Sequence, residues 1–83
     1  MNTGTITHIN PSNGMFIVRF DDGPHSVYEL LDSIDITIGD QVRCKLNALG
    51  PQEAFHLDQR QSFQVSGESG ECGLNAAFRL IRR

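Results

Sequence analysis

Hydrophobic and polar residues alternate through the first third of the chain in three short runs, and turn signals separate these runs. The runs are rich in β-branched and aromatic residues and cover residues 4–10, 14–21 and 25–31. Asn13-Gly14 and Asp22-Gly23 supply the positive φ angles of tight reversals, so each boundary has a local cause. The pattern predicts a meander of three antiparallel strands.

The alternation resumes after a nine-residue connection. Residues 32–40 carry three isoleucines at alternate positions, which favours an extended crossing over a helical turn. Residues 41–48 predict a fourth strand with Val42, Cys44 and Leu46 facing inward and Arg43, Lys45 and Asn47 facing outward. Gly50-Pro51 then turns the chain, and residues 53–59 predict a fifth strand.

The last 23 residues look like a second copy of this hairpin. Ala54-Phe55-His56-Leu57 is matched by Ala77-Phe78-Arg79-Leu80, and Phe63 and Val65 alternate in the preceding arm. Residues 66–71 read as a solvated hairpin loop. Residues 74–82 also suit a short helix, because Leu, Ala and Arg are good helix formers. We favour a strand, since the alternation has period two and Gly73 precedes it, and either hairpin could close a barrel.

Length and composition place the chain among small single-domain proteins. It has 83 residues, 39% of them apolar, and no apolar run long enough to span a membrane. Its start lacks the basic and apolar regions of a secretory signal, so we expect a cytoplasmic protein.

Cys44 and Cys72 read as ordinary thiols, the three histidines are scattered, and we expect no metal or cofactor. No nucleophile elbow or phosphate-loop motif is present, which argues against an enzyme.

The charge is unevenly distributed along the chain. Residues 1–42 carry a net charge of −5 and residues 43–83 a net charge of +2, giving −3 overall. So few cations predict that any binding to nucleic acid is weak and sensitive to salt. The one cationic cluster is Arg79, Arg82 and Arg83, which we interpret as a solubilising terminus.

The first half of the chain resembles the cold-shock domain family, an OB-fold that binds RNA and single-stranded DNA. The match rests on Gly4-Thr5-Ile6, Asn10, Gly14, Val18 and Asp21-Asp22-Gly23, and it continues through Val27-Tyr28 and Ile34. Residues 39–57 resemble the family's final hairpin. The resemblance implies an all-β fold: a small OB-type five-stranded antiparallel barrel over residues 1–60, with residues 61–83 as an additional hairpin packed on the same domain.

The resemblance also implies a surface for single-stranded nucleic acid. Family members stack bases on aromatic side chains over the meander. This chain has His8 at the family's Trp position, and Met15 and Ile17 at two Phe positions; only Tyr28 keeps an aromatic ring there. The implied binding residues are His8, Asn13, Met15, Ile17, Tyr28, Leu30 and Phe55, with Arg43 and Lys45 meeting phosphates.

The row Met15, Ile17, Tyr28 and Leu30 is apolar rather than aromatic and basic, so three interpretations stay open. It is a nucleic-acid face, a surface for a protein partner or a homodimer, or a row covered by the C-terminal hairpin. The expected function is a non-enzymatic, cold-shock-like module that binds single-stranded RNA or DNA. The alternative is a protein-interaction or structural OB module that has lost the nucleic-acid face.

Overall fold

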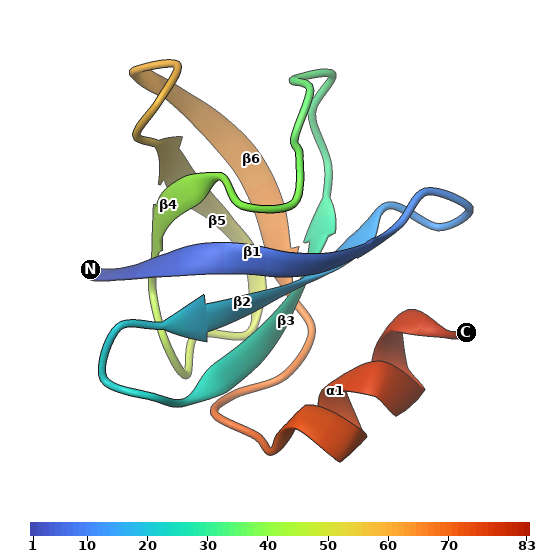
Figure 1. Ribbon diagram of the computed structural model, residues 1–83. Coiled ribbons are helices and arrows are strands. Elements are labelled where there is room, and N and C mark those ends of the chain that lie inside the picture. Colours follow the sequence, from blue (N-terminus) through green and yellow to red (C-terminus); the bar gives the residue numbers. More distant parts are fainter.

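The computed structural model describes all 83 residues as a strand-rich barrel followed by one short helix (Figure 1). The elements are β1 (Asn2–Asn10), β2 (Met15–Phe20), β3 (His25–Leu30), β4 (Gln41–Cys44), β5 (Gly50–His56), β6 (Gln61–Gly67) and α1 (Leu74–Ile81). The predicted all-β fold and the three-strand meander are confirmed. The helix is too short to cross a membrane, and no other helix is present.

All six strands form a closed antiparallel barrel in the order β1-β2-β3-β6-β5-β4, with β4 pairing back onto β1. The prediction of five strands is therefore wrong in number, although the barrel itself is confirmed. Residues 61–67 are not an added arm, because β6 lies between β3 and β5, where Val65 is opposite both Leu30 and Gln52. The predicted boundary at residue 60 falls inside the barrel, at a tight turn where Arg60 has φ 53°.

The C-terminal strand predicted for residues 74–82 is a helix. Leu74, Ala77, Phe78 and Ile81 have the i, i+3, i+4, i+7 spacing of an amphipathic helix, which coexists with the alternation. The closed barrel offers no free strand edge to pair with, so helical hydrogen bonds are the remaining way to satisfy this backbone. The predicted pairing of residues 77–80 with Phe63 and Val65 does not occur.

Apolar side chains gather in two separate clusters. The larger cluster fills the barrel and consists of Ile6, Phe16, Val18, Phe20, Tyr28, Ile34, Val42, Cys44, Ala54, Phe63 and Val65. The smaller cluster lies outside the barrel, between the meander and α1, and consists of Met15, Ile17, Val27, Ala77 and Ile81. In Figure 1, α1 packs below β2 and β3 on the outer side of the sheet.

The segment between β6 and α1 is bound along β3 instead of forming a solvated hairpin loop. The Glu68 N–H donates to the Val27 carbonyl at 2.9 Å, and the Cys72 N–H donates to the His25 carbonyl at 2.9 Å. The Ser26 hydroxyl donates to the Ser69 carbonyl at 2.9 Å. These bonds hold residues 68–72 along β3. Gly73 follows directly, so they also fix the point at which α1 begins.

Candidate nucleic-acid interface

Strand register decides which side chains point out of the meander. Ile17 is opposite Val27 on β3 and His8 on β1, and Met15 is opposite Glu29 and Asn10. We call the outward residues His8, Asn10, Met15, Ile17, Val27 and Glu29 the meander face. His8 lies on the meander face because the register shifts between Ile6 and His8. This β-bulge inserts one extra residue into β1, so the residues after it exchange the side of the sheet on which they lie.

Two residues predicted for this face point into the barrel instead. Tyr28 is fully buried, its ring is stacked on Phe16 with centroids 5.8 Å apart, and its hydroxyl donates to the Lys45 carbonyl at 3.0 Å. Leu30 packs against the same interior cluster. Because side chains alternate along a strand, the pairing of Ile17 with Val27 sends the odd-numbered residues of β3 outward. Tyr28 cannot stack on a base.

The rest of the predicted platform is covered by α1. Met15 is 5% exposed and Ile17 is 0% exposed, and both pack against the helix with Ala77 and Ile81. The third interpretation of the apolar row therefore holds for Met15 and Ile17, with a helix in place of a hairpin as the cover. His8 remains at the margin, where its ring meets Phe78 edge-on with centroids 4.6 Å apart.

Asn13 serves the helix as well. Its side-chain amide donates to the carbonyls of Ile81 and Arg83, both at 3.2 Å, and the amide of Asn10 also donates to the Ile81 carbonyl. The last carbonyls of a helix have no partners within it, so these amides satisfy them. The predicted nucleic-acid residue Asn13 is thus a cap for α1.

The three remaining predicted residues lie on another side of the barrel. Arg43 and Lys45 are exposed on and just beyond β4, and Arg43 is opposite Phe55 on β5, which is half-buried. Glu53 is exposed two residues before Phe55 and reduces the positive charge there. The structure therefore does not bring the nine predicted residues together into one surface.

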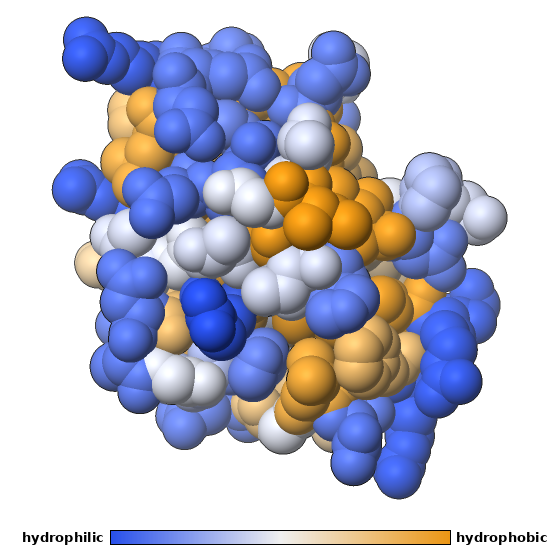
Figure 2. Space-filling view, viewed as in Figure 1, coloured by the Kyte–Doolittle hydropathy of each residue, from blue (hydrophilic) through white to orange (hydrophobic).

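A different cationic surface lies on the outer side of α1. Asn75, Phe78, Arg79 and Arg82 line a hollow of about 360 Å³, which we call the α1 hollow. Arg79 and Arg82 form no ion pair, and only Arg83 approaches a carboxylate, that of Glu68, at 3.9 Å. In Figure 2, hydrophilic residues border a hydrophobic patch in the region of α1 at lower right.

The sequence contained a signal for this hollow. Asn75, Phe78, Arg79 and Arg82 are spaced i, i+3, i+4, i+7, which places them on one side of a helix but on both sides of a strand. Predicting a strand for this segment hid the arrangement and left the arginines as a solubilising terminus.

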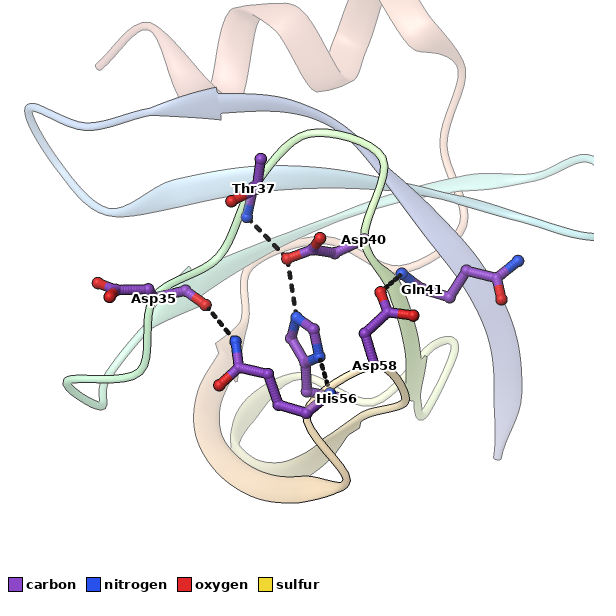
Figure 3. Close-up of polar contacts among 7 residues, drawn as sticks. Asp35, Thr37, Asp40, Gln41, His56 and Asp58 are labelled. Carbon is purple, nitrogen blue, oxygen red and sulfur yellow. Dashed lines mark hydrogen bonds and ion pairs between the residues drawn. The ribbon is translucent and has the colours of Figure 1, made fainter.

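The one group of side chains with metal-ligand chemistry joins the start of β4 to the end of β5. The ligand atoms of Asp40, His56 and Asp58 lie within 4.8 Å of one another (Figure 3). His56 Nδ1 accepts the Gln59 N–H at 3.1 Å, so in the neutral ring Nε2 carries the proton and donates to Asp40 Oδ2 at 2.8 Å. A metal at Nε2 would need the lone pair that this tautomer lacks.

Asp40 also accepts the Thr37 N–H at 2.8 Å, and the Gln59 amide donates to the Asp35 carbonyl at 2.8 Å (Figure 3). The cluster therefore ties residues 35–40 to the β5–β6 turn. Its groups are engaged in hydrogen bonds that hold these loops together, so the arrangement is suited to a structural role.

Comparison with protein-family models, with curated proteins and with solved structures gave no match. The resemblance to the cold-shock family consequently stays a prediction from the quoted residues.

Proposed function

We propose that the protein is a non-enzymatic module that binds single-stranded RNA or DNA weakly, and that it does so through the α1 hollow. The observation that supports this is the joint placement of two arginines that form no ion pair, an amide and an aromatic ring in one concavity. In this proposal nucleic acid does not bind across the meander face, because α1 covers its apolar residues and leaves His8 at the margin.

Charge favours α1 as the place where a polyanion binds. Residues 73–83 contain three arginines and no acidic residue, whereas residues 1–72 contain ten acidic residues and four basic ones. Arg79 and Arg82 can meet phosphate oxygens with several N–H groups each. A phosphate chain therefore meets attraction at α1 and repulsion over much of the barrel.

The size of the hollow favours a single strand. Its lining offers one aromatic ring, Phe78, with the His8 ring against it, which suits one unstacked base beside the phosphates that Arg79 and Arg82 meet. The two arginine–phosphate contacts that the hollow offers a single strand predict a slope of about −1.4 for log K against log salt concentration. Binding is accordingly weak at physiological ionic strength.

The test is a titration of the full chain with a labelled single-stranded oligonucleotide at several salt concentrations, followed by chemical-shift mapping. In the double variant Arg79→Gln/Arg82→Gln, affinity at low salt should fall at least about tenfold and the slope should move toward zero by about 1.4. The matched control Arg43→Gln/Lys45→Gln removes the same charge from the β4 side and should bind nearly as well as the parent. Equal losses in both variants would show that net charge, not the α1 hollow, governs binding.

A protein-interaction function is the second candidate, and a hydrophobic patch supports it. Figure 2 shows this patch above α1, where residues 32–40 cross the front of the barrel, and Ile38 in that segment is 60% exposed. Such a patch on a small domain is a feature of interaction sites. No perturbation of the α1 hollow by oligonucleotide at low salt would favour this candidate over the first.

A further inference from the structure

The barrel closes without any contribution from α1. Every strand is hydrogen-bonded to two neighbours, and the segment that precedes the helix is bound to β3 through the Cys72 N–H. The helix adds no strand pairing. Its release about Gly73 would leave the barrel hydrogen bonds intact and would uncover the meander face.

The meander face has the features of a site for a helix. Val27 and Ile17 form an apolar cross-strand pair, and Met15 extends it along β2 toward the β1–β2 turn. At that end the amides of Asn10 and Asn13 point at the last carbonyls of the seated helix. An apolar row with capping donors at one end fixes both the position and the direction of a bound helix.

α1 occupies this face with few anchors. It has eight residues, its N-cap Gly73 provides no side-chain hydrogen bond, and its first turn contains no acidic residue. Only Ala77 and Ile81 are buried. Helices this short are marginal without tertiary contacts, so α1 is held by these anchors, by the partly buried Phe78 and Leu80 that pack beside them, and by the two asparagines.

Charge complementarity indicates which other helix would fit the meander face. The barrel segment, residues 1–72, carries a net charge of −6, and the segment that contains α1, residues 73–83, carries +3. Glu68 lies 3.9 Å from Arg83, and Glu29 is half-buried on the meander face beside Met15. An occupant with basic residues near its C-terminal end is therefore favoured.

We propose that the meander face is a binding surface for an amphipathic, basic helix of a partner protein, and that α1 occupies it when the partner is absent. The partner helix has a small residue and a β-branched aliphatic residue four positions apart, as Ala77 and Ile81 are. It outcompetes α1 by being longer and capped at its N-terminus. This proposal uses the inner side of α1, whereas nucleic-acid binding is proposed for the outer side, and release of α1 would separate Phe78 from the His8 ring.

The probe is a synthetic helical peptide that carries the α1 sequence, two added N-terminal turns and a serine N-cap. It is titrated into the full chain with labelled methyl groups on Met15, Ile17 and Val27. We expect saturable shifts of these methyl resonances. A control peptide with aspartate at both anchor positions should produce none, and equal shifts with both peptides would overturn the proposal.

A second experiment weakens the packing of α1 on the meander face. Ala77→Asp removes one anchor of α1 and leaves the meander face unchanged, so the peptide should bind about tenfold more tightly than it does to the parent chain. If this variant does not fold, attenuation of the Met15 and Ile17 methyl signals of the parent chain by a spin-labelled peptide decides the question. Absence of attenuation, or formation of a dimer of the chain in place of the peptide complex, would each overturn the proposal.

Discussion

Cys44 and Tyr28 are two acidic groups held without charge in the barrel interior. Burial raises the pKa of the Cys44 thiol to about 12, and burial also raises the pKa of the Tyr28 hydroxyl far above its usual value. The cause is the same, because an anion in this interior would lose its hydration without gaining a cation. Both residues therefore keep their protons well into the alkaline range.

Stability should fall in alkali for this reason. Above about pH 9 the unfolded chain releases the Cys44 proton while the native chain retains it, so the native state binds more protons and the free energy of unfolding decreases as pH rises. The decrease approaches about 1.4 kcal/mol per pH unit for this thiol. Urea denaturation between pH 8 and pH 11 measures it.

The control for that measurement is Cys44→Ala, which removes the thiol and should flatten the decline between pH 9 and pH 10, before tyrosine titrates. A decline of the same steepness in this variant would contradict the assignment to Cys44.

The His56–Asp40 pair predicts a second effect at the scale of single residues. Asp40→Ala removes the acceptor of His56 Nε2–H, and His56 is 1% exposed, so water cannot readily replace the carboxylate. An unsatisfied buried donor costs about 1–3 kcal/mol, and the free energy of unfolding should drop by that amount.

Asp58→Ala is the matched control, because Asp58 is exposed and its one backbone contact, to the Gln41 N–H, is long at 3.4 Å. We expect a change within about 0.5 kcal/mol, measured by denaturant titration. If both variants lost the same stability, the loss of one negative charge from this region would be the cause, and not the loss of the His56–Asp40 hydrogen bond.

At the scale of elements, one short pattern adopts two structures. Ala54-Phe55-His56 ends β5, and Ala77-Phe78-Arg79-Leu80 lies in α1. In β5 the barrel buries Ala54 and His56, which alternate, whereas in α1 the meander face buries Ala77 and Ile81, which are four apart. The surface available for burial, not the local sequence, selects the period, so the pattern alone predicted the wrong structure for the second copy.

The meander was predictable because its turns are encoded locally, and its register was not. The register depends on the bulge that places His8 outward and on the pairing of Ile17 with Val27. A shift of one residue exchanges the two faces of a strand, which is why Tyr28 was assigned to the wrong side. The α1 hollow depends on the helix, so it could not be recognised while a strand was expected.

Removing α1 should leave a folded barrel. A chain that ends at Gly73 keeps all six strands and loses the packing of Ala77, Phe78, Leu80 and Ile81, of which Ile81 alone contributes roughly 1.5–3 kcal/mol. We expect a lower melting temperature with a single cooperative transition, and new exposure of Met15 and Ile17 detected by binding of a hydrophobic dye.

A chain that ends at Arg60 provides the contrast, because it lacks β6 and leaves β3 and β5 without their shared neighbour. It should give no dispersed amide spectrum. Unfolding of the chain that ends at Gly73 as well would mean that α1 is an integral part of the barrel fold.

At the scale of the whole molecule, the division between negative and positive charge coincides with the division between barrel and helix. The strands and their loops contain all ten acidic residues, and the helix that packs outside them is the acid-free cationic part. This distribution gives the molecule an electrical polarity along the direction from barrel to helix. Under the proposed function, this polarity would orient an approaching polyanion toward α1 before any contact forms.

The position of β6 has a consequence for the chain as it is synthesised. β1, β2 and β3 are complete by Leu30, yet β3 acquires its second neighbour only when residues 61–67 have left the ribosome. During that interval the outer edge of β3 presents unpaired N–H and C=O groups, which can recruit a strand from another nascent chain. The finished barrel has no such edge, so the risk of aggregation is concentrated in the interval between translation of the meander and insertion of β6.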